Sequence, residues 1–131
     1  MAYELHREDP ILRVVFSGVL TNRDLSRALE ELAQIEAELD VVPDRITDIR
    51  PVDRLEIDFA GALALAEARR RRVYKNAFKT AFIAADAVHI GAARMFQTVS
   101  SHPQISVEIF TDEESALHWL RPAAARRSAG A

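Results

Sequence analysis

The sequence predicts a single α/β domain in which a mixed, mostly parallel five-stranded sheet packs against about four helices. Three observations support this fold class. Two short β-branched segments open the chain on either side of a turn signal and predict an N-terminal hairpin. Apolar residues then occur alternately at helical spacing and in short runs, which is typical of a parallel sheet covered by helices. The length of 131 residues fits one domain.

The hairpin and the first helix are the clearest elements. Residues 3–8 and 11–16 predict two strands around the turn signal Asp9-Pro10, and Gly18 closes the second strand. Thr21 then has the form of an N-cap, with an acid three residues later. The apolar residues that follow recur at helical spacing, and acids occupy the other face, so this segment predicts an amphipathic helix.

The middle of the chain predicts two strands and a helix. Residues 45–49 are expected to form the third strand, and residues 50–57 a loop that is broken by a proline. Asp58 can cap the second helix, which is expected over residues 59–72. Residues 79–85 are almost continuously apolar, as expected for a central strand that is buried on both faces.

The last third of the chain predicts two more helices and one strand. Asp86 can cap the third helix, residues 105–110 predict the fifth strand, and residues 111–114 have the form of a capping box before the last helix. We therefore assign residues 1–121 to the domain. Residues 122–131 contain no large apolar side chain and are expected to be a mobile tail.

Composition excludes several classes of protein. The chain has no Cys, which excludes a disulfide scaffold and a thiolate nucleophile. A formal net charge of −3 argues against nucleic acid as a partner. No apolar run reaches the roughly 20 residues of a membrane span, and a secretion signal is not evident, so a cytoplasmic protein is expected. The run at 69–72 is four arginines; they either complement a helix C-terminus or meet an anionic partner or lipid surface.

The element order and three segments resemble the STAS-type domains, in particular the SpoIIAA-like group that includes anti-sigma-factor antagonists. The resemblance spans residues 3–121. Its segments are the hairpin strand and turn at 12–21, the strand Ile46-Thr47-Asp48-Ile49 before a helix start with Gly61, and the closing strand and helix at 107–120. These segments mostly encode folding, so the resemblance implies a fold more specifically than a function.

The resemblance also implies where a regulatory switch would lie. In anti-sigma-factor antagonists, an Asp-Ser-Ser-Gly motif at a helix start carries the Ser that a partner kinase phosphorylates. The matching residues here are Asp58-Phe59-Ala60-Gly61. The phosphorylated Ser is replaced by Ala60, which has no hydroxyl, so this switch cannot operate at that position.

The expected binding edge is formed by the loops that follow the parallel strands, here residues 50–58 and 86–89. Helix starts at such an edge suit anions, and Gly61 would allow close approach of a ligand or of neighbouring backbone. Asp58 and Asp86 either simply cap their helices or also border a partner surface.

Two further side chains are candidates for the binding edge. Asp48 lies near the end of a predicted strand and either pairs with Arg50, two residues later, or serves a ligand. His89 falls in the first turn of a helix and is either a packing histidine or a functional group. The residues predicted to bind a partner or ligand are Asp48, Arg50, Asp58, Phe59, Ala60, Gly61, Asp86 and His89.

Sequence motifs for catalysis or cofactor binding are not found. The sequence has no Gly-x-Ser-x-Gly elbow, no Gly-x-Gly-x-x-Gly loop and no His-Glu-x-x-His pair. We therefore expect no catalytic residues, no cofactor and no metal site. An enzyme would require Asp48, Asp58, Asp86 and His89 to converge, and nothing in their spacing requires that they do.

Two functions remain open. The first is a non-catalytic regulatory or protein-interaction module of the STAS type, which recognises a protein partner through residues 50–61 and the start of the third helix, and for which a homodimer is plausible. The second is a carrier for an apolar small molecule or lipid, since the STAS-type fold looks similar to the core of Sec14-type lipid-binding domains. In that case residues 59–65 and 88–96 would open a pocket beneath the edge.

Overall fold

The computed structural model describes residues 3–99 and 101–121, so the tail predicted at 122–131 lies outside the described residues. Along the described chain, three strands precede the first helix, two strands follow it, and helices and strands then alternate. The strands are β1 (Tyr3–Glu8), β2 (Ile11–Phe16), β3 (Gly18–Thr21), β4 (Asp44–Asp48), β5 (Val52–Glu56), β6 (Phe78–Ile83) and β7 (Ile105–Phe110). The helices are α1 (Asn22–Ala37), α2 (Phe59–Arg70), α3 (Ala87–Val99) and α4 (Glu113–Leu120).

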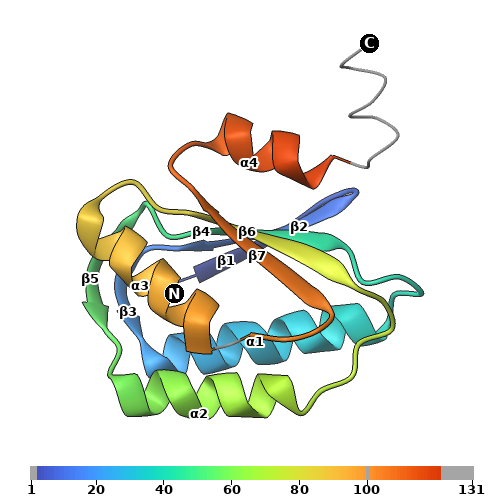
Figure 1. Cartoon of the computed structure of the whole chain (residues 1–131), viewed down its shortest axis with the longest axis horizontal. Helices are drawn as coiled ribbons and strands as arrows, with labels where there is room; N and C mark the ends of the chain where they lie inside the picture. The colour runs from blue at the N-terminus through green and yellow to red at the C-terminus, as the bar shows by residue number, and fades with distance from the viewer. Residues whose placement is uncertain (1–2, 100, 122–131) are drawn as a thin grey trace.

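Five of these strands form one mixed sheet in the order β1-β2-β4-β6-β7. β1 runs antiparallel to β2, and every other pair of neighbours in the sheet is parallel. Figure 1 shows α1 and α2 side by side along one side of this sheet, with α4 on the opposite side. The predicted hairpin, five-stranded sheet and α/β fold class are confirmed.

Two further strands form a separate small sheet that the sequence analysis did not predict. Gly18 does not end the extended chain: its φ of 66° turns the backbone, and β3 follows directly. β3 pairs in parallel with β5, so the expectation of a loop over residues 50–57 is wrong. The proline sits just before the strand, where the Pro51 carbonyl accepts a hydrogen bond from the Gly18 N–H at 3.3 Å, and Val52 is buried in the core.

Alternation of side chains along the central strands divides the domain into two layers. Residues of one face pack with α4, and this cluster comprises Ile46, Ala81, Ile83, Ala116 and Leu120. Residues of the other face pack with α1 and α3, and this cluster includes Val14, Phe16, Ala28 and Ala93. The side chains of β4 and β6 therefore reach both layers.

The helices begin at the predicted N-cap residues, except that the cap of one helix lies one residue later than predicted. Thr21 and Asp24 form the capping box of α1, and Asp58 caps α2. The cap of α4 is Asp112, which accepts a hydrogen bond from the Ser115 N–H at 2.7 Å, so the box predicted over residues 111–114 is displaced by one residue. Each cap satisfies an amide that the helix itself leaves unpaired.

Candidate functional site

The residues predicted to form one site are distributed over both layers. Asp48 and Arg50 lie at the end of β4, and Asp48 shares the sheet face of Ile46, which α4 covers. Arg50 donates from Nε at 3.0 Å and from Nη2 at 2.9 Å to the two carboxylate oxygens of Asp48. The Arg50 backbone N–H also donates to Asp48 Oδ1 at 3.0 Å. The expected ion pair is therefore present.

This pair belongs to a network of charges that joins the sheet to α4. Burial raises the pKa of the Asp48 carboxyl, but hydrogen bonds from Arg50 outweigh burial and hold that pKa below its usual 3.8. Arg50 also lies within electrostatic range of Asp112 and Glu113 at the start of α4. Arg13 of β2 donates to Glu113 at 2.6 Å. The network connects three elements, which supports a structural role for Asp48 and Arg50.

Residues 58–61 lie at the start of α2, where α1 also begins. Asp58 Oδ1 accepts a hydrogen bond from the Gly61 N–H at 2.6 Å, as an N-cap does. A Cβ at Gly61 would lie 2.2 Å from Asn22 Nδ2, so the group that approaches this glycine is a side chain of α1. Phe59 is 60% exposed and Ala60 is also exposed.

Asp86 and His89 lie at the start of α3. Asp86 Oδ1 accepts a hydrogen bond from the His89 N–H at 2.9 Å, which caps the helix as expected. The His89 ring is buried, and its Nδ1 lies 3.3 Å from Asp86 Oδ2. His89 is therefore buried at the start of α3, in a different layer from the pair formed by Asp48 and Arg50.

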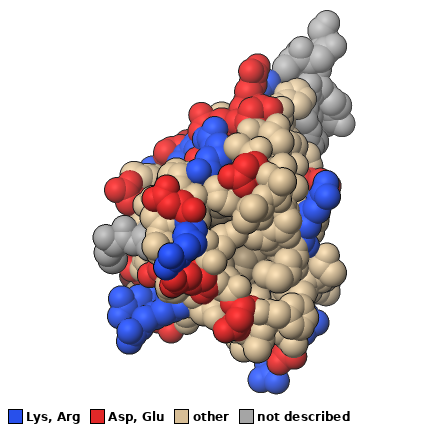
Figure 2. Space-filling model, turned by 90° about the vertical axis from the view of Figure 1, so that its left-hand side faces the viewer, with Lys and Arg blue, Asp and Glu red and all other residues tan. Residues whose placement is uncertain are grey.

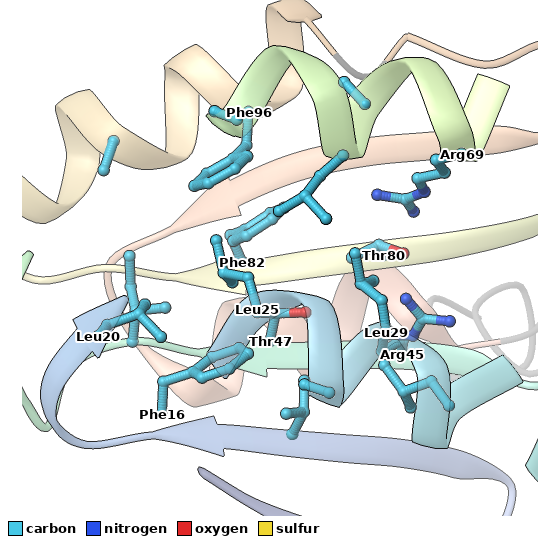
Figure 3. Close-up of a pocket in the computed structure, with 18 of the residues that line it drawn as sticks. Phe16, Leu20, Leu25, Leu29, Arg45, Thr47, Arg69, Thr80, Phe82 and Phe96 are labelled. Carbon is cyan, nitrogen blue, oxygen red and sulfur yellow. The ribbon is translucent and has the colours of Figure 1, made fainter. Parts of the chain in front are cut away.

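A cavity of about 80 Å³ lies between the sheet and the helices α1, α2 and α3. The sequence predicted its walls only at residues 59–65 and 88–96, and it missed the lining that the sheet and α1 contribute. Apolar side chains from all of these elements surround the cavity (Figure 3). They include Phe16, Leu20, Leu25, Leu29, Phe82 and Phe96. Protein interiors are normally packed with few voids larger than a water molecule, so this space is a candidate binding site.

A surface groove of about 460 Å³ between α1 and α2 adjoins the cavity. The groove and the cavity share five lining residues, which are Leu29, Leu32, Arg45, Leu65 and Arg69. These shared residues form the boundary between the interior space and the surface. A molecule that enters from the groove would pass them to reach the cavity.

Polar groups gather at this boundary. Arg45 of β4 is only 5% exposed, and its Nη2 donates to the buried carboxylate of Glu36 at 3.0 Å. Burial lowers the pKa of Arg45 to about 10, although Glu36 opposes this change. Thr80 of β6 lines the same space, and Figure 3 shows the Arg45 and Arg69 side chains at one end of the pocket near Thr80.

One sequence signal could have indicated this boundary. Arg45 and Thr47 flank Ile46 at alternate positions of a buried strand, so both polar side chains face the same layer. Thr80 occupies the same layer on the neighbouring strand, where it is paired with Arg45 in the register. Polar residues at consecutive inward positions are the type of buried polar group that requires a partner.

Two further observations concern the described part of the chain, and they bear on membrane-spanning helices and on metal ligands. Within residues 3–99 and 101–121, no helix is both long and apolar enough to cross a membrane. In the same residues, His, Asp and Glu side chains form no cluster of three that could hold a metal ion.

Comparison of the chain with models of protein families and with curated proteins gives no match. Among solved structures, the chain is similar to an uncharacterized protein of the DUF3478 family from Shewanella loihica PV-4, whose crystal structure has a SpoIIAA-like fold. The two chains are 21% identical with a TM-score of 0.59, and the likeness covers 92% of this chain and 93% of that one. Together with the sheet order and the helix layers, this likeness shows that the chain has a SpoIIAA-like fold.

Proposed function

We propose that the protein is a non-catalytic binding module of the STAS type that holds a small apolar molecule between its sheet and the helices α1–α3. The observation that carries this proposal is the apolar cavity and its continuation into the groove. The cavity alone, at about 80 Å³, is smaller than the roughly 300–1,000 Å³ of common ligand pockets, so the molecule would extend from the cavity into the groove of about 460 Å³. Of the two functions that the sequence left open, the carrier has this direct geometric support.

The positions of the titratable residues support a non-catalytic role. Asp58 and Asp86 each cap a helix, and Asp48 is bound to Arg50 on the other face of the sheet. A catalytic acid or base needs to be within hydrogen-bond reach of its substrate, together with its partner groups. These three carboxylates face different elements, so they offer no common reaction centre.

Isothermal titration calorimetry with 1-octanol tests the proposal. Ala66 of α2 is buried and lines the cavity, so Ala66→Leu fills part of the space that the ligand would occupy. We expect 1-octanol to bind the wild type, and Ala66→Leu to weaken this binding about tenfold. The matched control is Ala64→Leu, an exposed position on the same helix that does not line the cavity.

The control variant should bind octanol within about twofold of the wild type. Far-UV circular dichroism shows whether each variant remains folded. Equal octanol binding in the two variants would place the ligand elsewhere. The proposal would be rejected if titration of 1-octanol into the wild type released or absorbed no heat and left the melting temperature of the protein unchanged.

A protein-interaction module is the second candidate, because large apolar side chains are exposed at the starts of two helices. Phe59 at the start of α2 is 60% exposed and Val88 at the start of α3 is 68% exposed. Figure 2, which views the side on which α3 and β5 lie, shows uncharged surface bordered by acidic and basic side chains. Exposed apolar area of this kind is typical of surfaces that contact a partner. Failure of the octanol experiment would favour this candidate.

A further inference from the structure

The pocket has two ends of different chemistry. At one end, aromatic and aliphatic side chains surround the cavity, among them Phe16, Leu20 and Phe96 (Figure 3). At the other end, where the cavity meets the groove, the lining includes Arg45, Arg69 and Thr80. An apolar molecule without a polar group would leave this second end unpaired. A pocket with this division of polarity matches a ligand that is itself amphipathic.

Buried polar atoms at this second end lack partners among the described residues. Arg45 is 5% exposed, and its Nε donates no hydrogen bond even though its Nη2 is paired with Glu36. The Oγ1 of Thr80, a residue 1% exposed, and the Nη2 of Arg69 are also buried without a partner, as is the acceptor Oε2 of Glu36. Groups able to donate therefore outnumber the unpartnered acceptor at this end. A buried donor that lacks an acceptor is unfavourable, so several such atoms in one place indicate an acceptor that is supplied from outside the chain.

The charges at this end favour a ligand with one negative charge. Arg45, Arg69 and Arg72 contribute three positive charges to the lining here, and Glu30 and Glu36 contribute two negative charges, which leaves a formal charge of +1. The positive charge of Arg69 also disfavours the charged form of Arg45, since the two guanidinium groups repel each other at this boundary. A single carboxylate between them would neutralise the excess charge and relieve the repulsion. A doubly charged group would leave a buried negative charge, which is costly.

We propose that the ligand is an apolar organic acid whose carboxylate binds the guanidinium groups of Arg45 and Arg69, while its hydrocarbon part fills the cavity between the sheet and α1–α3. This inference rests on the proposed function, and it adds the chemical class of the ligand. A carboxylate is planar and accepts two parallel hydrogen bonds from guanidinium donors, so it fits the unpartnered Nε of Arg45 and Nη2 of Arg69. Thr80 Oγ1 can donate a further hydrogen bond at the same place.

The test compares three ligands that share one hydrocarbon chain. Octanoate, 1-octanol and octyl phosphate are titrated into the wild type by isothermal titration calorimetry at pH 7.5, where the carboxylate is ionised and the phosphate carries close to two charges. We expect octanoate to bind at least about tenfold more tightly than 1-octanol, because it adds charge-assisted hydrogen bonds. Octyl phosphate should bind more weakly than octanoate.

Variants of α2 locate the acid-binding end. Arg69→Gln should reduce the affinity for octanoate about tenfold and reduce the affinity for 1-octanol by a smaller factor, so the preference for octanoate is lost. Arg69→Lys keeps the charge and should retain part of the preference for octanoate. The matched control is Arg70→Gln, which removes the same charge from the same helix at an exposed residue that does not line the pocket. This control should bind all three ligands as the wild type does.

The outcomes separate this inference from the proposed function. If 1-octanol and octanoate bind equally, or if Arg69→Gln and Arg70→Gln have equal effects, water fills the polar end and the acid assignment is wrong, while the apolar pocket stands. If octyl phosphate binds more tightly than octanoate, the ligand class is a phosphate and the carboxylate assignment is overturned. If none of the three ligands binds, the proposed function fails as well.

Discussion

Arg45 is the residue whose environment is most unusual in this domain. It lies in a central strand, with a guanidinium group that is buried against a largely apolar cavity. A buried ion pair such as the one between Arg45 and Glu36 adds little net stability, since removing both charges from water offsets their attraction. An apolar residue would satisfy packing at this position. A binding role for the free donor of Arg45 gives a reason for the arginine.

Asp48 provides a test of the charges on the opposite face of the sheet. We expect Asp48→Asn to lower the free energy of unfolding by about 1–2 kcal/mol at pH 7, because the hydrogen bonds from Arg50 to a charged acceptor are weakened. The folded pKa of Asp48 lies below its unfolded value. The contribution of the pair is therefore complete above about pH 4 and is lost as the pH falls through the folded pKa.

Urea unfolding at pH 7 and at pH 3 measures this difference. The gap between the wild type and Asp48→Asn should narrow at pH 3, whereas Asp53→Asn, which changes an exposed acid of β5, should match the wild type at both values. A gap of the same size at both pH values would mean that the charge of Asp48 does not stabilise the fold.

Sequence reasoning succeeded at this scale where the interacting residues are close in the chain. Asp48 and Arg50 are two residues apart, and the caps Asp58 and Asp86 each bind an amide three residues later. The partners at Arg45 could not be predicted in this way. Glu36 lies on α1 and Arg69 lies on α2, and only the packing of these helices on β4 brings the three side chains to one boundary.

At the scale of the element, α2 combines the surface that the sequence predicted with a pocket that it predicted only in part. Its start carries the cap Asp58 and the exposed Phe59. Ala62 and Ala66, its small inward residues, line the cavity, and Arg69 lies in its last turn at the boundary with the groove. The arginine run therefore has at least one member with a defined environment. This division along one helix predicts that changes at its start affect stability rather than binding.

The cap of α2 tests this division. Asp58→Ala removes the acceptor of the Gly61 N–H and should lower the free energy of unfolding by about 1 kcal/mol, whereas Asp58→Ser keeps a capping oxygen and should lose only part of that stability. Both variants should bind 1-octanol as the wild type does, because Asp58 does not line the cavity. Urea unfolding and calorimetry provide the two measurements. Loss of octanol binding in Asp58→Ser would show that the helix start belongs to the binding site.

The small sheet of β3 and β5 shows where element prediction from sequence fails. Residues 52–56 alternate only partly between apolar and polar, and a proline precedes them, so the local pattern favours a loop. Their partner strand β3 is more than 30 residues earlier in the sequence. A parallel pair of this kind is stabilised by contacts between distant segments, which local propensity does not report.

At the scale of the whole molecule, the binding space belongs to no single element. Three helices and the strands β2, β3, β4, β5 and β6 contribute lining residues. Periodicity identifies which side chains face inward, but the space that they leave depends on how closely the helices pack on the sheet. The pocket expected from residues 59–65 and 88–96 was therefore placed only in part. Leu65 and Phe96 line the cavity, whereas Phe59 and Val88 are exposed.

The most direct measurement of the central claim is a methyl-resolved ¹H–¹³C NMR titration of the protein with 1-octanol. If the molecule binds between the sheet and the helices, the largest shift changes will be those of Val14, Leu29 and Leu65, which line the pocket. The chemical shifts of the methyl groups of Val73 and Val88, which are exposed, will not change. Large chemical-shift changes at Val73 and Val88, with the shifts of Val14, Leu29 and Leu65 unchanged, would contradict the claim. They would place octanol on the exposed apolar surface.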